Sequence, residues 1–366
     1  MTTSHLRQLA ETHALFDWPY VTVFRVNLTL EGPKPQYRTH ASLDKLDKAI
    51  RRSEEVGWLK TLGIKAESWE GLKERVVKNW DVIVEAAAKR LGEEVRSELN
   101  TLRDKLNDDK MAREVIAPAL QLIQVERLGV NEATLRYLGA ATSGAINGDG
   151  YVSAARKEAG LTSGKLEVAL LEAAVLAAHG IKAEVKRVWS ALNVAASGVG
   201  AARLAGLYFL YGHPLLEGDD RLKSHKLADA VRLGAEGLDI RWEGLMRTDG
   251  GLVAADLTIS VDGAAVKYNV YLRGDVIGLQ FQSTDRSRAE LAARLLRLTG
   301  VGAEVRRVGD EWQVVVYTGK LAAGHERLRS ALAKIVEAVR SNGWVDEKRA
   351  ERWLKKLEKG RVSKEG

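Results

Sequence analysis

LLEAAVLAAHGIKAEVKRV at Leu170–Val188 and ELAARLLRLTGVGAEVRRV at Glu290–Val308 decide the fold, because the two stretches align without a gap. Each has a helical pattern of apolar residues, then a glycine, then a strand pattern. The two glycines, Gly180 and Gly300, stand at a constant offset (300 − 180 = 120). Glycine is favoured just past a helix because it adopts the left-handed conformation without a steric penalty. The sequence therefore predicts one α/β unit that occurs twice.

The match extends on both sides of these stretches. Leu161–Ser163 corresponds to Phe281–Ser283, and Leu192–Ser197 corresponds to Gln313–Thr318 with one residue inserted. Before the first stretch, Asn131 is expected to cap a helix rich in small residues, which a strand hairpin follows. We therefore expect an α/β (α+β) fold with two diverged αββαββα units in a pseudo-twofold arrangement, preceded by a mainly helical N-terminal region.

The rest of the chain gives the domain prediction. VTVFRVNLTL at Val21–Leu30 alternates as a half-buried strand does, GPKP at Gly32–Pro35 is expected to end that strand, and Ser42 is expected to open a helix. The spacing of apolar residues from Leu91 to Leu106 is typical of packed helices. The predicted segments are 1–66, mixed strand and helix; 67–129, a helical hairpin region; 130–215, the first unit; 216–343, the second unit, closed by a long helix at Ala322–Ser341; and 344–366, a charged C-terminal helix and tail.

The composition excludes several kinds of site. The chain has no cysteine, which excludes disulfides and zinc sites built on thiolates. Its seven histidines include no pair at helical metal-ligand spacing, so a histidine-built metal site is not expected. There is no signal pattern, and no apolar run approaches the roughly 20 residues of a membrane helix, so we expect a cytoplasmic protein. The formal net charge of +7 is a modest excess that favours polyanionic partners.

TSGAINGDG at Thr142–Gly150 resembles the LAGLIDADG signature of homing endonucleases. The residues that match the signature are Gly144, Ile146, Asp149 and Gly150. Asn147 stands where the signature has its first acidic residue. The elements around the motif, from about Asn131 to Ser341, are also expected in the order that the family has.

The resemblance implies a DNA-cutting site on a DNA-binding sheet. In the family, the last acidic residue of the motif binds a divalent cation that activates water, so Asp149 would be the catalytic and metal-binding residue. Mg²⁺ would be its cofactor if nuclease activity is retained. The implied partner is double-stranded DNA, with no membrane, bound by a monomer with an internal pseudo-dimer that could oligomerise further through 67–129. The predicted DNA contacts are Arg156, Lys157, Lys182, Lys186, Arg187, Arg273 and Arg306. The predicted helix-packing residues are Gly139, Ser143, Gly144, Gly148 and Gly150.

The second unit offers no matching acid, because the offset of 120 places Asn269 at the counterpart of Asp149. Asn-Gly-Asp-Gly at Asn147–Gly150 is also ordinary turn chemistry between a helix and a hairpin. Two hypotheses therefore stay open. The first is a DNA-binding protein of homing-endonuclease descent that retains Mg²⁺-dependent nicking or cleavage. The second is a catalytically inactive paralogous-repeat protein that acts as a DNA-binding regulator or a protein–protein scaffold.

Stretches between Asp149 and Gly360 carry a second resemblance. DGYVSAARKEAGLTSG, ASGVGAARLAGLYFLYG, VKYNVYL, FQSTDRSRAELAARLLRLTGVGAEV and GWVDEKRAERWLKKLEKG look very like the PaRep repeat-protein family of hyperthermophilic crenarchaea. The family occurs as multicopy paralogues and has no established activity, so it implies an intracellular archaeal setting and a mobile-element or paralogous-repeat origin. It supplies no catalytic residues.

Overall fold

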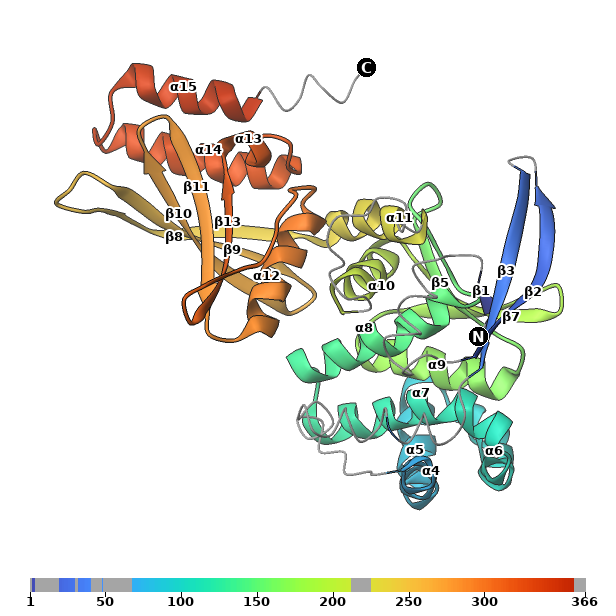
Figure 1. The fold of residues 1–366 in the computed structure, drawn as a ribbon. Coiled ribbons are helices and arrows are strands. Elements are labelled where there is room, and N and C mark those ends of the chain that lie inside the picture. The colour runs from blue at the N-terminus through green and yellow to red at the C-terminus, as the bar shows by residue number, and fades with distance from the viewer. Residues whose placement is uncertain are drawn as a thin grey trace. The chain divides into compact units, whose positions relative to one another are not determined.

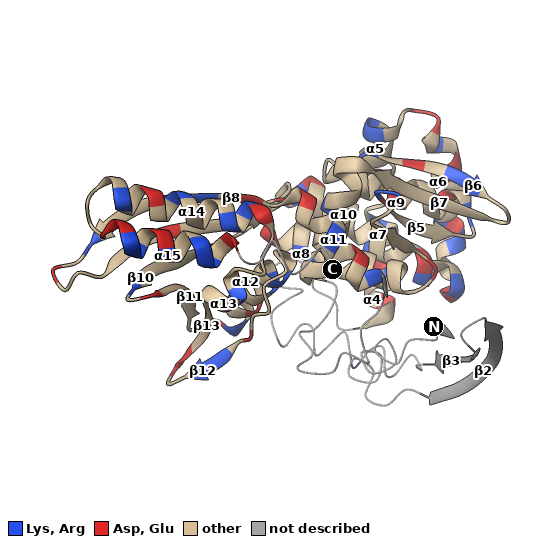
Figure 2. Cartoon of the chain, turned by 90° about the horizontal axis from the view of Figure 1, so that it is seen from above, with Lys and Arg blue, Asp and Glu red and all other residues tan. Residues whose placement is uncertain are grey.

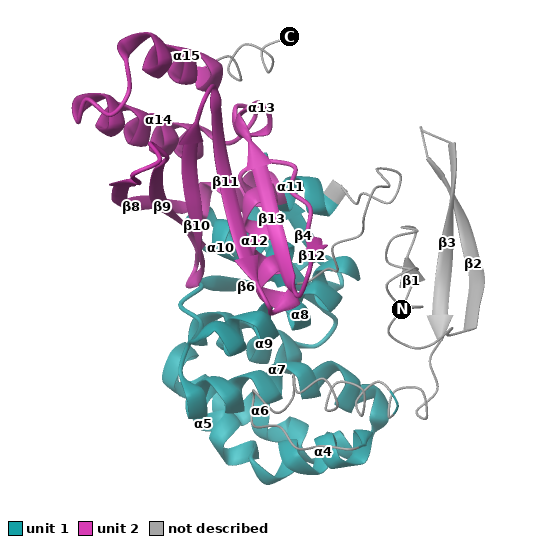
Figure 3. Ribbon diagram, turned by 60° about the vertical axis from the view of Figure 1, so that its left-hand side comes forward, with its two compact units in different colours: residues 1–230 teal, residues 231–366 magenta. Residues whose placement is uncertain are grey.

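The computed structural model describes residues 2–3, 20–29, 32–40, 48, 68–211 and 225–358, drawn as a ribbon in Figure 1. The chain forms two compact units, Met1–Ala230 and Val231–Gly366, which Figure 3 colours separately. We call them unit 1 and unit 2. Each combines helices with antiparallel sheet, and this confirms the α+β fold class.

The first sheet of unit 1 has the strand order β1-β3-β2. Its strands are β1 (Thr2–Thr3), β2 (Tyr20–Thr29) and β3 (Gly32–His40). As expected, β2 ends before GPKP, but those residues then begin β3 and pair with β2. Pro33 and Pro35 precede Tyr37 and Arg38, the residues of β3 that pair with β1. The missing N–H groups of the two prolines therefore remove no hydrogen bond between β3 and β1. The helix predicted from Ser42 lies outside the described residues except for Lys48.

Four helices follow in unit 1: α4 (Trp69–Lys78), α5 (Trp80–Leu91), α6 (Val95–Arg103) and α7 (Asp109–Leu128). The Ser68 hydroxyl caps α4 by accepting from the backbone N–H of Gly71, at 3.2 Å. Trp80, Leu99 and Leu122 are fully buried among these helices. This helical layer packs on α9 (Leu166–Ala178) through α5, α6 and α7.

The remainder of unit 1 is an αββαββα arrangement around a four-stranded sheet of order β4-β5-β7-β6. Along β7 the residues Leu192, Val194 and Ala196 are buried, and helices α8, α9 and α10 pack on the sheet, leaving the alternate residues on a helix-free face. The elements besides α9 are α8 (Glu132–Asn147), β4 (Tyr151–Ser153), β5 (Glu158–Ser163), β6 (Ala183–Val188), β7 (Ala191–Ser197), α10 (Gly198–Tyr211) and α11 (His225–Gly234).

Unit 2 contains a six-stranded antiparallel sheet of order β12-β13-β11-β10-β9-β8. The buried residues of β10 contact the helix layer: the hydroxyl of Tyr268 donates to the carbonyl of Ala292 in α12, at 2.7 Å. The elements are β8 (Asp239–Arg247), β9 (Val253–Val261), β10 (Ala264–Arg273), β11 (Val276–Ser283), α12 (Arg286–Leu298), β12 (Arg306–Val308), β13 (Glu311–Tyr317), α13 (Thr318–Leu321), α14 (Glu326–Ser341) and α15 (Glu347–Glu358).

The two units share a ββαββ segment in which strands pair at the same offset. Leu161 pairs with Val194 in unit 1, and Phe281 pairs with Val314 in unit 2. The strand orders β4-β5-β7-β6 and β10-β11-β13-β12 correspond, and α9 and α12 have the same bounds after the offset of 120. The expected one-residue insertion before the last strand is therefore wrong, since β7 and β13 align directly.

The helix ends of these two segments also agree in detail. The Gly180 N–H donates to the third carbonyl before it at 2.9 Å, and the Gly300 N–H does the same at 2.9 Å. Both glycines have the left-handed conformation, with φ of +71° and +80°. The next residue in each, Ile181 or Val301, donates back five residues into the helix. This is the Schellman pattern of helix termination, and it explains why glycine stands at both positions.

The second segment departs from the first at its start. Strands β8 and β9 precede β10 where unit 1 has α8, so the described residues of unit 2 lack the first helix of the expected αββαββα order. The hairpin is also two residues longer, because Tyr151 pairs with Gly160 (160 − 151 = 9) while Asn269 pairs with Gln280 (280 − 269 = 11). Asn269 is therefore the counterpart of Tyr151. The expectation that it replaces Asp149 is wrong, since that position falls on Lys267.

The long helix expected at Ala322–Ser341 is also shorter at its start. It begins only at Glu326, after the short α13 and a turn at Gly324. A Cβ at Gly324 would lie 2.9 Å from the side chain of Val301, so the chain bends here against the end of α12. His325 then caps α14, its Nδ1 accepting from the Arg327 N–H.

Candidate functional site

Asp149 lies in the tight turn between α8 and β4, and its side chain is exposed. The N–H of Gly148 donates to the carbonyl of Gly144 at 3.1 Å, and the N–H of Gly150 donates to that of Ala145 at 3.0 Å. A Cβ on Gly150 would lie 2.7 Å from the carbonyl oxygen of Gly160. The close approach of the turn to β5 thus explains the glycine that follows Asp149.

The ammonium group of Lys226, from α11, sits on this turn. Its Nζ donates to the carbonyl oxygens of Ile146 at 2.6 Å, Gly150 at 2.7 Å and Gly148 at 3.3 Å. The last carbonyls of a helix lack partners within the helix and lie at the negative end of its dipole, so they attract a cation. Burial lowers the pKa of Lys226, and the negative charge of Asp149 opposes that change. Lys226 therefore supplies a built-in cation beside Asp149.

The residues around Asp149 do not fit the Mg²⁺ ion that the LAGLIDADG resemblance implies. Mg²⁺ requires about six oxygen ligands, usually including more than one anionic group or a bound phosphate. In the described residues, no three His, Asp or Glu side chains gather as a metal site. The backbone oxygens nearest Asp149 already bind Lys226.

Asn147 stands where the signature has its first acidic residue, and its side chain forms hydrogen bonds within the fold. Its side-chain oxygen accepts from the hydroxyl of Tyr208 in α10 at 2.6 Å, and its Nδ2 donates to the Ser143 hydroxyl at 3.1 Å. All three residues are buried. The amide therefore ties α8 to α10, and sequence reasoning did not identify Tyr208 as its partner.

The predicted helix-packing residues fall into different environments. A Cβ on Gly139 would lie 2.5 Å from the carbonyl oxygen of Leu207, so α8 and α10 of unit 1 cross in close contact there. Ser143 is buried beside Asn147. Gly144 has open space around its missing side chain, whereas Gly148 and Gly150 belong to the turn.

On unit 1, part of the predicted basic set lies on the helix-free face. The guanidinium of Arg156 lies over the ring of Tyr151, 5.5 Å from its centroid. Lys186 pairs across the sheet with Asn193 on the same face and forms an ion pair with Glu184 at 2.8 Å. The pKa of Tyr151 is raised chiefly by burial and then by nearby Glu158, and lowered by the charges of Arg156 and Lys186. These charges therefore gather around one ring.

The other basic residues predicted for unit 1 lie apart from that cluster. Arg187 pairs with Leu192, whose side chain is buried under the helices, so Arg187 lies on the opposite face from Lys186. Lys157 occupies the β4–β5 turn with a φ of +52°. Lys182 is exposed just before β6. The predicted set thus does not form a single face. Blue segments in Figure 2 mark the basic residues of β6 and of β12.

On unit 2, the helix-free face is rich in amide side chains that the sequence reading did not select. Along β10 every second residue is buried, and the alternate residues, including Lys267, Asn269 and Arg273, lie on the helix-free face. Asn269 pairs with Gln280, whose Nε2 donates to the Oε1 of Gln282 at 3.1 Å. The alternation of polar and apolar residues in VKYNVYL was the signal that could have identified this face.

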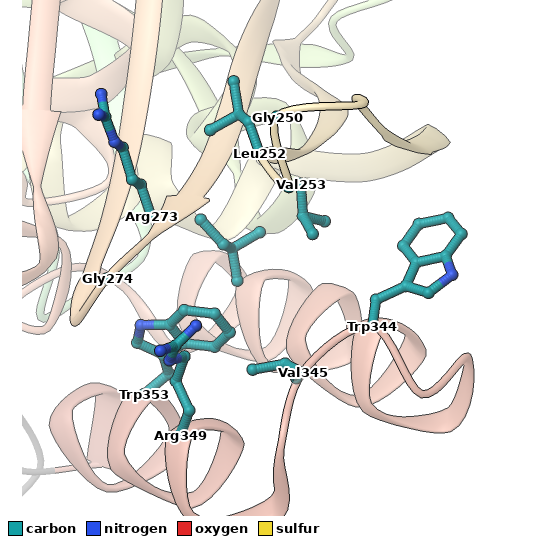
Figure 4. Close-up of a pocket in the computed structure, with 11 residues that line it drawn as sticks. Gly250, Leu252, Val253, Arg273, Gly274, Trp344, Val345, Arg349 and Trp353 are labelled. Carbon is teal, nitrogen blue, oxygen red and sulfur yellow. The ribbon is translucent and has the colours of Figure 1, made fainter.

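Two predicted DNA contacts belong to this face of unit 2. Arg306 pairs with Gln313 on β13 and forms an ion pair with Glu304 at 3.1 Å. Its neighbour Arg307 pairs with Trp312 on the opposite face, and its guanidinium lies 5.9 Å from the centroid of that ring. Arg273 borders a small pocket but extends away from Trp353, which points into it (Figure 4).

That pocket lies wholly within unit 2, among the β8–β9 turn, the end of β10 and the segment that leads into α15. Its lining is formed by Leu252, Val253, Trp344, Arg349 and Trp353 among others. It includes no Asp, Glu or His side chain, so it offers no acid–base pair for catalysis.

Comparison with known proteins connects unit 2 with a family. Residues 245–363 match the sequence model of the PaRep2b protein. The match covers less than half of the chain and supports the resemblance to the PaRep family. None of the curated proteins compared matches the chain. Within the part of the chain that the structure describes, no helix combines the length and apolar character needed to cross a bilayer.

Proposed function

We propose that this chain is a DNA-binding protein of homing-endonuclease descent that holds duplex DNA on helix-free sheet faces and does not cut it through Asp149. The observation that carries the proposal is the face of unit 2, where exposed amides and cations alternate with a buried apolar core along β10. Descent is supported by the αββαββα order of unit 1 and by the ββαββ segment that recurs in unit 2.

The chemistry of this face suits a DNA groove. Asn and Gln side chains recognise adenine through paired hydrogen bonds, and the row that contains Asn269, Gln280 and Gln282 presents three of them. The cations Lys267 and Arg306 can neutralise phosphates. Lys267 is held by Asp256 at 2.9 Å and Arg306 by Glu304, but exposed ion pairs contribute only about 0–1 kcal/mol. A phosphate can therefore replace the carboxylate.

From the two positions at which a homing endonuclease would carry its acidic residues, we infer that DNA is not cut. In unit 1, Lys226 occupies the backbone oxygens beside Asp149. In unit 2, the corresponding position is Lys267, a cation inside β10. In-line attack on a phosphodiester needs a metal ion or a comparable group that stabilises the attacking and the leaving oxygen. A single carboxylate beside an ammonium group does not provide this stabilisation.

The division of the chain into two diverged units is part of the same proposal. Residues 130–215 and 216–343 would be diverged LAGLIDADG-like units, the second having lost the motif helix. The scaffold hypothesis would draw on the helical region 67–129, whose apolar residues are largely committed to internal packing: Trp80, Ile83, Leu99 and Leu102 are all fully buried. DNA binding is therefore the better supported of the two.

The test is binding of fluorescent 30-base-pair duplexes to the full chain, measured by anisotropy over a series of salt concentrations. A protein that neutralises several phosphates should lose affinity with a log–log slope of about −0.9 for each phosphate. We expect a slope steeper than about −3. Absence of duplex binding at low salt would overturn the proposal, as would binding that does not respond to salt.

A further inference from the structure

Trp189 is the feature of unit 1 that neither the fold nor the sheet face explains. It lies in the two-residue turn between β6 and β7, where Val188 pairs with Ala191. Its side chain is 94% exposed, more than any other large apolar residue that the structure describes. An indole in water contributes almost nothing to the core, so burial within unit 1 does not account for it.

The backbone makes Trp189 still less expected. Its φ is +59°, in the left-handed region, where any residue with a Cβ is disfavoured relative to glycine. The matching hairpin of unit 2 has Gly309 at the corresponding place, with a φ of +60°. The two turns thus have the same backbone conformation at this position. In unit 1 the residue is a tryptophan, for which the left-handed conformation is less favourable than it is for glycine. A contact outside the chain would offset that cost.

The surroundings of Trp189 indicate the chemistry of the contact. Exposed Lys182 lies just before the strand that leads to it, and the strand carries exposed Lys186 and Arg187, on opposite faces, against one acid, Glu184. The side chain of Val188, next to the turn, is 43% exposed. An aromatic ring behind a cluster of cations is the combination that binds nucleic acid, since cations attract phosphates and the ring stacks on a base. A lipid surface would favour a broader apolar patch, and the residue after Trp189 is Ser190.

We propose that Trp189 is a stacking residue that inserts against a nucleobase of the bound nucleic acid while the helix-free face of unit 1 contacts its backbone. The inference rests on the proposed DNA binding and adds a contact to it. The tip of the β6–β7 hairpin would place the indole at a base step, where the face of the aromatic ring stacks on a base. The basic residues of β6 hold the phosphates on either side.

The experiment compares the affinity of the full-length protein and its variants for a 30-base-pair duplex by anisotropy. Trp189→Ala should weaken binding by about 5- to 100-fold, the range found when a stacked aromatic residue is removed. Trp189→Phe should stay within about threefold of wild type, whereas Trp189→Leu should weaken binding as the alanine variant does. The salt slope should be the same in all three, because no charge changes. Val199→Ala, at a residue that is 78% exposed on α10, serves as the control and should bind as wild type.

The outcomes separate this inference from the proposed function. If wild type fails to bind duplex, the proposed function itself is wrong. If wild type binds and Trp189→Ala binds equally well, only the stacking contact is overturned. Full affinity in Trp189→Leu would also overturn it, because an aliphatic side chain cannot stack as an aromatic one does. Tryptophan-dependent binding to phosphatidylglycerol vesicles, with unchanged DNA affinity in Trp189→Ala, would assign Trp189 to a membrane surface instead.

Discussion

The Nζ atom of Lys226 lies 2.6 Å from the carbonyl oxygen of Ile146, at the end of the helix that leads to Asp149. The same ammonium reaches the carbonyls of Gly148 and Gly150. The turn that resembles a metal site thus has a lysine as its cation. This relationship links the stability of unit 1 to the chemistry that Asp149 can perform.

Replacement of Lys226 should therefore destabilise unit 1. Lys226→Met leaves the carbonyl oxygens of Ile146 and Gly150 without their donor, and we expect a loss of about 1–3 kcal/mol in the free energy of unfolding. Urea denaturation followed by circular dichroism measures it. Lys334→Met, at an exposed position on α14, is the control and should change the free energy by less than about 0.5 kcal/mol. Equal behaviour of the two variants would contradict the role of Lys226.

Magnesium should leave the stability of the protein unchanged. A ligand that binds the folded state at a concentration 100 times its dissociation constant would add about 2.7 kcal/mol. Thermal unfolding with and without about 10 mM MgCl₂, roughly a hundred times the dissociation constant of a typical site, should give the same midpoint for wild type and for Asp149→Asn. A Mg²⁺-dependent rise in wild type that Asp149→Asn abolishes would show that Asp149 binds the metal after all.

Two glycines of α8 should respond in opposite directions to the same substitution. Gly139→Ala places a Cβ 2.5 Å from the Leu207 carbonyl oxygen, so α8 and α10 must separate and we expect a loss of about 1–3 kcal/mol. Gly144→Ala meets no atom within 4 Å and should stabilise the helix by about 0.5–1 kcal/mol. Chemical denaturation of both variants tests the difference, and a destabilised Gly144→Ala would argue against the open surroundings of that position.

Glu172 should make unit 1 less stable as the pH rises. Burial, with a smaller contribution from the charge of Glu114, raises the pKa of Glu172 from 4.5 to about 7. The folded state then holds this proton more tightly than the unfolded state, so the contribution to stability is full below about pH 4.5 and is lost as the pH rises through 7. The loss amounts to about 3 kcal/mol.

Denaturation at several values between pH 5 and pH 8 measures this slope. Glu172→Gln should remove the part due to Glu172, because the amide does not ionise. Glu98→Gln, at an exposed position on α6, should leave the slope as in wild type. Identical slopes in Glu172→Gln and wild type would show that Glu172 is not the group responsible.

Both hairpin turns should be most stable with glycine at their left-handed position. At the left-handed position of Trp189, the glycine variant should be about 1 kcal/mol more stable than Trp189→Ala. At the corresponding position of unit 2, Gly309→Ala should lose about 1 kcal/mol. Thermal or urea unfolding compares them. A stable Gly309→Ala would mean that the backbone there relaxes out of the left-handed region.

The elements with strong local signals could be predicted from the sequence. The apolar run Leu166–Ala178 is the helix α9 with those bounds, and Gly180 ends it in the left-handed conformation. Asn131 caps α8 as expected, through a reciprocal hydrogen-bond pair with Thr134. These features depend on residues close together in the chain, which is why a sequence pattern reveals them.

The candidate site could be predicted only in part, because it depends on distant residues. Nothing local marks Lys226 as the partner of Ile146, which is separated from it by 80 residues in the chain. The β10–β11 hairpin is two residues longer than its counterpart in unit 1, and this moved Asn269 away from the position matched by counting, since the register is fixed by pairing with Gln280. The opposite faces of Lys186 and Arg187 likewise follow from the pairing of β6 with β7.

Duplex binding by variants at two neighbouring arginines of β12 tests the central claim most directly. Arg306 lies on the helix-free face of unit 2 and Arg307 on the opposite face, so each variant removes one charge from the same strand. We predict that Arg306→Ala weakens binding and makes the log–log salt slope shallower by about 0.9, while Arg307→Ala changes neither. Equal effects of the two substitutions, or a larger effect of Arg307→Ala, would contradict binding through the helix-free face.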